Sequence, residues 1–273
     1  TGGCVAVLHS LFRNISVLSL LLGAGFASGE EIRSFHDKPD LPTSEIKSGY
    51  EFLTRESRAL QSDDFANPGL LWVDRGEILF HEEGEHKSCA SCHKGQGNYT
   101  LAGAAATFPK MVSGRLTNLE VQINHCRVER QRLVAFEYES EKQLSLTAYV
   151  ASLSRGMPYQ VSIAGDARSS FTRGRDYFFQ RRGQLNLACT QCHDDNQGKL
   201  LRGDRISQGH PNAYPGYRLE WQTFGSLHRR IQDCDVGVKA APFEAGSTTY
   251  IELELYLAWR AKHLLLESPG IRR

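Results

Sequence analysis

The chain has 273 residues, of which 40% are apolar, so it can bury one large core or the cores of two smaller domains. Its formal net charge is +1, and its charged residues are well mixed, without a basic low-complexity tract. This balance argues against an electrostatic nucleic-acid binder, and we expect a soluble surface and no nucleic-acid partner.

The first 27 residues resemble an export signal. Arg13 supplies a positive charge ahead of a mostly apolar stretch over residues 15–27, and Gly25-Phe26-Ala27 fits a cleavage site. The stretch is shorter than the about 20 residues that a membrane-spanning helix needs. We therefore expect a signal peptide, a periplasmic location and a mature protein without a membrane span. A buried N-terminal helix is the alternative.

Two regions of turn-forming residues divide the rest of the chain. Polar residues with Pro39 and Pro42 follow the signal and predict an extended arm, with one helix near residues 50–60. A second region, with Pro158 and Gly165, predicts a linker. The predicted divisions are a signal peptide (1–27), an arm (28–64), a first domain (65–156), a linker (157–170) and a second domain (171–273).

The pentapeptide C-x-x-C-H occurs twice, as Cys89-Ala90-Ser91-Cys92-His93 and as Cys189-Thr190-Gln191-Cys192-His193. In this motif the two thiols attach a c-type haem through its vinyl groups, and the histidine binds the iron. A single copy could be chance or half of a zinc site, but two copies predict two covalently bound haem c groups. The predicted attachment residues are Cys89, Cys92, Cys189 and Cys192, and the first iron ligands are His93 and His193.

The sequence around the two motifs repeats one plan. Apolar residues at helical spacing predict a helix over residues 70–82, and Arg75-Gly76 within it matches Arg173-Gly174 ahead of the second motif. Tyr149-Val150-Ala151 matches Tyr256-Leu257-Ala258 near the end of each half. Further helices are predicted over residues 116–128, 139–154, 219–233 and 248–263. We expect a mainly α fold of two tandem cytochrome-c-like domains, each with one covalent haem c.

Two cysteines remain once Cys4 leaves with the signal and four belong to the motifs. Cys126 and Cys234 each end an apolar series with steps of three, four and three residues. The series are Leu116, Leu119, Ile123, Cys126 and Phe224, Leu227, Ile231, Cys234. If each series follows one helix face, each cysteine faces its own haem. This equivalence favours Cys126 and Cys234 as second iron ligands over a disulfide between the halves, and thiolate ligation predicts low haem potentials.

Other second ligands remain open. Met157 could serve the first haem as in electron-transfer cytochromes, but the second half contains no methionine. His125, beside Cys126, could give a haem with two histidine ligands. His210 and His228 are the corresponding candidates in the second half.

The halves differ beside the two remaining cysteines. Gln122 lies four residues before Cys126, whereas Arg230 lies four residues before Cys234. At this helical spacing a guanidinium is a neighbour of the thiol, lowers its pKa and can bind a tetrahedral oxyanion. We therefore expect any chemistry to belong to the second haem.

Arg230 also has structural interpretations, as a partner of a haem propionate or in a salt bridge with Glu220 or Asp233. After Cys234 the chain continues through Gly237, which allows a tight turn, to Lys239, a second cation near the predicted site. Nothing comparable follows the cysteine of the first half.

Residues 214–243, which read YPGYRLEWQTFGSLHRRIQDCDVGVKAAPF, resemble the active-site segment of the SoxA family. SoxA proteins are the larger cytochrome subunits of the SoxAX complex of bacterial sulfur oxidation. The resemblance extends over nearly the whole mature chain, including residues 48–53, 64–69 and 256–261, and fits the two-haem form of the family. Lys239 stands where arginine is common.

The resemblance implies an L-cysteine S-thiosulfotransferase. Such an enzyme couples thiosulfate oxidatively to a cysteine of the SoxYZ carrier and passes two electrons to c-type haems, with the small cytochrome SoxX as partner. It implies that Cys234 is the catalytic iron ligand and persulfide carrier, and that Arg230 contacts the substrate anion. The alternatives are a two-haem electron carrier without sulfur chemistry and a haem-based sensor or structural subunit.

Overall fold

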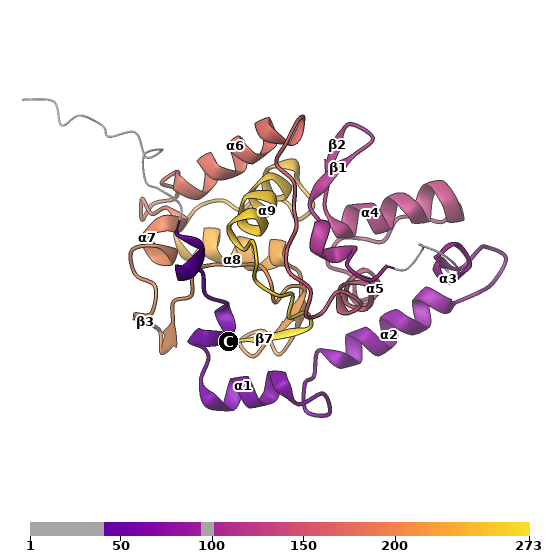
Figure 1. Ribbon diagram of the computed structural model, residues 1–273, viewed down its shortest axis with the longest axis horizontal. Coiled ribbons are helices and arrows are strands. Elements are labelled where there is room, and N and C mark those ends of the chain that lie inside the picture. The colour runs from indigo at the N-terminus through magenta and orange to yellow at the C-terminus, as the bar shows by residue number, and fades with distance from the viewer. Residues whose placement is uncertain (1–40, 94–100) are drawn as a thin grey trace, which may run out of the picture. The chain divides into compact units, whose positions relative to one another are not determined.

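The computed structural model describes residues 41–93 and 101–273, which belong to one compact unit. The predicted signal peptide and residues 28–40 of the predicted arm lie outside the described residues. The described chain is mainly helical, with short strands in ladders of two or three (Figure 1). Within it, none of the helices is long and apolar enough to span a membrane.

The elements follow one another in a regular order. The helices are α1 (Arg55–Ser62), α2 (Leu70–His81), α3 (Cys89–Cys92), α4 (Leu119–Cys126), α5 (Glu141–Ser152), α6 (Ala167–Phe179), α7 (Cys189–His193), α8 (Leu227–Gly237) and α9 (Thr248–Arg260). Short 3-10 helices are η2 (Thr43–Glu45), η3 (Gly49–Phe52) and η4 (Ala105–Thr107), and η5 (Arg127–Gln131) is a short π-helix. The strands are β1 (Lys110–Val112), β2 (Arg115–Thr117), β3 (Leu200–Leu201), β4 (Asp204–Arg205), β5 (Gly216–Arg218), β6 (Thr223–Gly225) and β7 (Gly270–Arg272).

Two stretches of the chain repeat one arrangement, and we call residues 70–152 the first repeat and residues 167–260 the second repeat. Each begins with a long helix, α2 or α6, which packs along the closing helix, α5 or α9 (Figure 1). Between them lie a short cysteine helix, the antiparallel hairpin β1-β2 or β5-β6, and a further helix, α4 or α8. The second repeat also contains the antiparallel ladder β3-β4.

The matched glycines of the sequence lie where the paired helices approach most closely. A Cβ atom on Gly76 would stand 1.9 Å from the backbone oxygen of Ser145, and one on Gly174 would stand 1.9 Å from that of Glu252. These partners are equivalent, since Ser145 and Glu252 lie four residues before the matched tyrosines Tyr149 and Tyr256. Glycine therefore sets the helix spacing in both repeats.

The hairpins correct part of the predicted pattern. Leu116 lies in β2 and Phe224 in β6, so neither is on the helix that carries the cysteine. The helices begin later because Asn118 caps α4, accepting from Val121 N at 3.0 Å, and Ser226 caps α8, accepting from Arg229 N at 3.2 Å. The predicted helix over residues 219–233 is thus wrong before residue 227.

The remaining predicted helices are confirmed within a few residues. The prediction over residues 70–82 corresponds to α2, that over 139–154 to α5 and that over 248–263 to α9. The expected helix near residues 50–60 is present as η3 followed by α1. The predicted linker contains the start of α6, which begins at Ala167.

The cores of the two repeats interlock. Leu116 of the first repeat belongs to the core of the second, where the largest buried side chains include Tyr250, Tyr256 and Phe178. Phe224 of the second repeat packs with Leu144 and Ala148 of α5. Each hairpin is therefore packed against the core of the other repeat.

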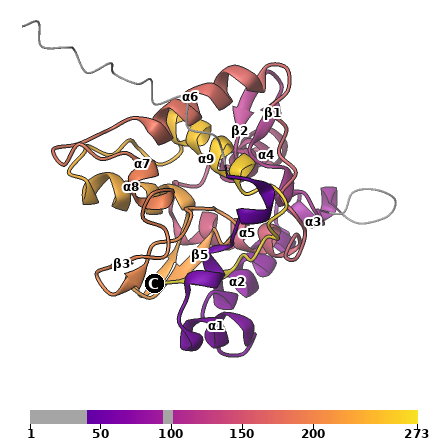
Figure 2. The same cartoon turned by 60° about the vertical axis from the view of Figure 1, so that its left-hand side comes forward.

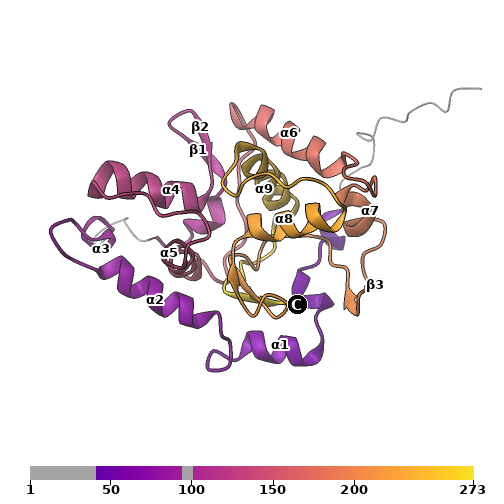
Figure 3. The ribbon, with the colours of Figure 1, turned by 180° about the vertical axis from the view of Figure 1, so that it is seen from behind.

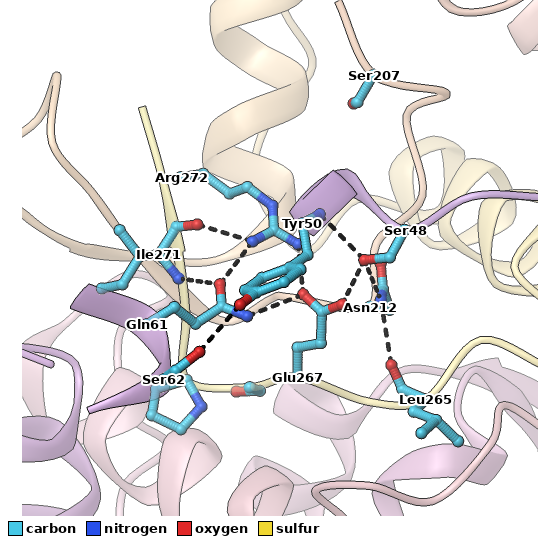
Figure 4. Close-up of polar contacts among 12 residues, drawn as sticks. Ser48, Tyr50, Gln61, Ser62, Ser207, Asn212, Leu265, Glu267, Ile271 and Arg272 are labelled. Carbon is cyan, nitrogen blue, oxygen red and sulfur yellow. Dashed lines mark hydrogen bonds and ion pairs between the residues drawn. The ribbon is translucent and has the colours of Figure 1, made fainter. Parts of the chain in front are cut away.

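The end of the predicted arm is fastened to the C-terminal segment. Glu267 accepts hydrogen bonds from the Ser48 hydroxyl, from Gln61 Nε2 at 3.2 Å and from Arg272 Nη2 at 2.6 Å (Figure 4). The Asn212 amide donates to Ser48 Oγ at 3.1 Å. Strand β7 completes a sheet of order β6-β5-β7 and contacts α1 (Figure 2).

Candidate functional site

The second C-x-x-C-H motif forms the one-turn helix α7. The Ala188 N–H donates to the Gln191 side chain at 2.7 Å and thereby fixes the start of this helix. Ring atom Nδ1 of His193 lies 2.7 Å from the carbonyl oxygen of Ser207. This contact orients the imidazole and leaves Nε2 free to bind a metal. Burial lowers the pKa of His193 to about 4, which favours the neutral ring that ligation requires.

Gly209 makes room for this imidazole. Its φ of +75° is a left-handed conformation that favours glycine, and a Cβ atom there would stand 2.9 Å from His193 Cγ. Gly103, also with positive φ, lies the same distance ahead of Pro109 as Gly209 lies ahead of Pro215. The C-x-x-C-H motif alone does not indicate a role for Gly209. The equal spacing of the two glycines from their prolines is the sequence signal that could have located it.

Cys234 is part of α8, and α8 comes near α7 in the ribbon views (Figure 3). The pKa of Cys189 is raised first by burial and then by the nearness of Cys234, and the pKa of Cys192 is raised in the same order. The structure therefore brings the predicted attachment cysteines and the predicted second ligand into one neighbourhood.

Arg230 lies one helical turn before Cys234 and is half-buried. The nearby Cys234 raises the pKa of the Arg230 guanidinium, as Tyr214 does to a smaller extent. Neither expected carboxylate partner is free for it: Glu220 accepts from Arg218 at 2.9 Å, and Asp233 accepts from Trp221 at 2.7 Å.

In the part of the chain that the structure describes, the Arg230 side chain makes no ion pair or hydrogen bond. The salt-bridge interpretation of this residue is therefore not what the structure contains. Lys239, the second predicted cation, is exposed and has a left-handed φ of 58°.

The first repeat places Cys126 near its own haem motif in the same way, but the polar residue beside the cysteine is Gln122. Gln122 Nε2 lies 3.3 Å from Cys126 Sγ, where the second repeat has Arg230. The pKa of Cys89 is raised by burial and by Cys126, and Arg127 opposes this shift. His93 follows within the same motif and is half-buried, whereas Cys92 is exposed.

The competing ligands differ in availability. His228 Nε2 lies 3.0 Å from Glu254, and its Nδ1 accepts from Gly246 N at 2.8 Å, so both ring nitrogens are used. His125 is exposed. Met157 is 37% exposed, and its sulfur would stand 3.3 Å from a Cβ atom added to Gly103. His210 is buried, with Nε2 on Gln208 at 3.0 Å and Nδ1 lacking a partner among the described residues.

The cysteines fit covalent haem better than a disulfide. All six described cysteines are free, including Cys126 and Cys234. Each repeat brings a C-x-x-C-H helix near a cysteine on the helix that follows its hairpin. The free Nε2 of His193 and the space kept by Gly209 suit an iron porphyrin at α7.

Comparisons with known proteins agree on the family. The protein-family model of the SoxA/TsdA cytochrome c domain matches residues 75–159. The L-cysteine S-thiosulfotransferase subunit SoxA of Rhodovulum sulfidophilum is 37% identical over 232 residues, which are 84% of this chain and 80% of that protein. The same subunit of Pseudaminobacter salicylatoxidans is 36% identical over 237 residues, which are 85% of this chain and 82% of that protein.

A solved structure supports the same assignment. The crystal structure of SoxXA from P. pantotrophus matches with a TM-score of 0.79 and 35% sequence identity, covering 84% of this chain and 87% of the matched chain. The cytochrome c domain of this family carries covalently bound haem c. The chain therefore belongs to the SoxA family, the cytochrome subunits of L-cysteine S-thiosulfotransferase.

Proposed function

We propose that the chain forms two tandem cytochrome-c-like domains, each of which binds one haem c. The repeated order of elements and the equivalent glycines at both helix contacts support this proposal. The attachment residues would be Cys89 and Cys92 in the first repeat and Cys189 and Cys192 in the second, with His93 and His193 binding the irons.

Cys126 and Cys234 would be the second iron ligands. Both lie eight residues after the cap of their helix, and both are close to the first cysteine of the motif in their own repeat. His228 is engaged through both nitrogens, and His125 is exposed, which favours the two cysteines. With thiolate ligands, the bound haems supply low-potential redox centres.

The second repeat is the proposed site of sulfur chemistry. In the net reaction, the sulfur of a carrier cysteine thiol joins the outer sulfur of thiosulfate. One S–S bond forms, one proton and two electrons leave, and the product is a carrier cysteine S-thiosulfonate. Cys234 would bind the transferred sulfur, and Arg230 would hold the sulfonate oxygens. The pairing of Arg230 with Cys234, which has no counterpart at Cys126, carries this assignment.

Two protein partners follow from this reaction. A small SoxX-like cytochrome c subunit would accept the electrons, as the match to a SoxXA complex supports. A SoxYZ-like carrier would supply the cysteine, and thiosulfate would be the small-molecule substrate. The proposed location is the periplasm, where c-type haem is attached.

The direct test is Cys234→Ala in the two-haem protein with its cytochrome partner, the carrier and thiosulfate. We expect thiosulfate-dependent reduction of cytochrome to be lost, because the variant lacks both the iron ligand and the sulfur-binding atom. Haem content and the low-spin signal of the first haem should remain. Full turnover by Cys234→Ala would place the chemistry elsewhere.

The same protein also tests the electron-carrier alternative. Low-spin histidine–thiolate signals from both haems are expected in the spectrum of the purified protein. A readily reducible haem with a methionine signal would favour the simple carrier.

A further inference from the structure

A buried carboxylate directly follows Cys234. Asp235 is 5% exposed, and its Oδ2 accepts hydrogen bonds from Tyr177 Oη at 2.6 Å and Tyr250 Oη at 2.7 Å. Arg182 Nε lies 3.3 Å from Oδ1. A carboxylate in the last turn of a helix is opposed by the helix dipole. The two hydroxyl donors and the Arg182 ion pair come from three separate segments, and they compensate for that position and for the loss of water.

The network joins the segment that precedes the second haem motif to the segment that follows Cys234. Arg182 precedes Cys189, stacks over Tyr177 with its guanidinium carbon 4.3 Å from the ring centroid, and donates to Ala241 O at 3.4 Å. Backbone hydrogen bonds run from Gln184 N to Lys239 O at 3.2 Å and from Leu185 N to Val238 O at 3.3 Å. The chain entering α7 is thereby tied to the chain leaving α8.

The first repeat lacks this network. The residue after Cys126 is Arg127, whose guanidinium lies 3.5 Å from the Phe136 ring centroid and donates to Val134 O at 3.3 Å. By the register of the paired glycines, the positions of Tyr177 and Tyr250 are Leu79 and Gln143 in the first repeat. Of the two cysteines, only Cys234, with Arg230 one helical turn before it, is therefore followed by a carboxylate that accepts from two hydroxyl donors.

We propose that Asp235 is a positioning residue for the reaction at Cys234. Held by Tyr177, Tyr250 and Arg182, it fixes the C-terminal turn of α8 against the segment that leads into α7. It thereby sets where the Cys234 sulfur lies relative to the haem attached at Cys189 and Cys192. This inference rests on the proposed function of Cys234.

The experiment compares Asp235→Ala with Asp235→Asn in the two-haem protein. Two quantities are measured: thiosulfate-dependent turnover with the partner cytochrome and carrier, and the low-spin electron paramagnetic resonance signals of both haems. Asp235→Ala should lower kcat roughly tenfold to a hundredfold, the scale expected when a reacting atom is misplaced by about 1 Å. KM for thiosulfate should change little, and only the second haem's signal should shift.

Asp235→Asn should lie between the wild type and Asp235→Ala, because its amide oxygen still accepts from the two hydroxyls. Tyr250→Phe removes one donor and should shift the same signal by a smaller amount. This variant keeps the test open if Asp235→Ala fails to fold. Tyr50→Phe is the matched control and should leave both readouts unchanged, since among the described residues the Tyr50 hydroxyl hydrogen-bonds only with the exposed Ser62, at 3.0 Å.

Three results would overturn the positioning role. Asp235→Ala and Tyr250→Phe could both keep the wild-type signal and kcat. Asp235→Ala could lower only haem content or melting temperature, while the haem-loaded fraction turns over normally. Both haem signals could shift together, which would indicate a general structural effect. Failure of the proposed function has a different signature, because Cys234→Ala would then retain turnover.

Discussion

Arg230 is a half-buried cation beside a thiol, and it makes no ion pair within the described chain. Thiosulfate is a dianion, so its approach to a thiolate is unfavourable unless a cation offsets the repulsion. The two carboxylates expected as its partners, Glu220 and Asp233, are engaged by Arg218 and Trp221. The guanidinium is therefore available to an incoming anion.

Arg230→Ala should lower thiosulfate-dependent turnover by about one to two powers of ten, since lost charge-assisted hydrogen bonds are worth about 1.5–3 kcal/mol. Coupled thiosulfate oxidation with both partners measures this loss, and haem content should be unchanged. Gln122→Ala, the equivalent change at Cys126, is the matched control and should be nearly neutral. Equal losses in the two variants would show that the second haem is not the distinct catalytic one.

The long helices could be predicted from the sequence more closely than the hairpins. Apolar periodicity located α2, α5 and α9 because their buried faces span several turns. The same periodicity wrongly predicted a helix over residues 219–225, because Phe224 continues the apolar spacing of α8 although it lies in β6. Only the cap at Ser226 separates strand from helix, and a cap is a single-residue signal.

Side-chain networks were less accessible to sequence reasoning. Nothing in the local sequence of Tyr177 or Tyr250 indicates that both hydroxyls meet Asp235. That convergence depends on how α6, α8 and α9 pack. The ligand candidates Cys126 and Cys234 could be found because the two repeats can be compared with each other. The Asp235 network occurs in the second repeat alone, so no such comparison could reveal it.

The contact between paired helices can be tested at Gly174. A Cβ atom there would overlap the backbone oxygen of Glu252, which cannot move without separating α6 from α9. Gly174→Ala should therefore destabilise the protein by roughly 1–3 kcal/mol or more, although alanine favours a helix. The melting temperature of the haem-loaded protein checks this. Gly84→Ala, whose Cβ would meet only His86 at 3.5 Å, should be nearly neutral, and equal melting temperatures would contradict the tight contact.

At the scale of the whole unit, a cavity of about 30 Å³ lies where the two repeats meet. Its lining includes Glu120 and Thr147 of the first repeat, Glu254 of the second and Tyr159 from between them. The Thr147 hydroxyl is fully buried and has no hydrogen-bond partner among the described residues. A polar space of this size holds about one or two water molecules, and we expect ordered water to bridge the repeats there.

The two carboxyl groups make this junction sensitive to pH. Burial, and then the neighbouring Glu254, raise the pKa of Glu120 to about 8 from 4.5. Glu254 lies 3.0 Å from His228 Nε2 and accepts from the Asn118 amide at 3.0 Å. The raised pKa means that Glu120 keeps its proton near neutral pH. Repulsion from Glu139 raises the pKa of Glu120 by a smaller amount.

Because the native state binds the Glu120 proton more tightly than the unfolded chain, this group's contribution to stability is complete below about pH 4.5 and falls as pH rises towards about 8. Glu120→Gln keeps a neutral side chain of similar shape at every pH. The variant should therefore lose part of the wild-type decline in melting temperature across this window. Glu141→Gln, an exposed change on α5, should leave the decline intact. If the melting temperatures of the wild type and Glu120→Gln decline equally with pH across this window, then burial at the junction does not raise the pKa of Glu120.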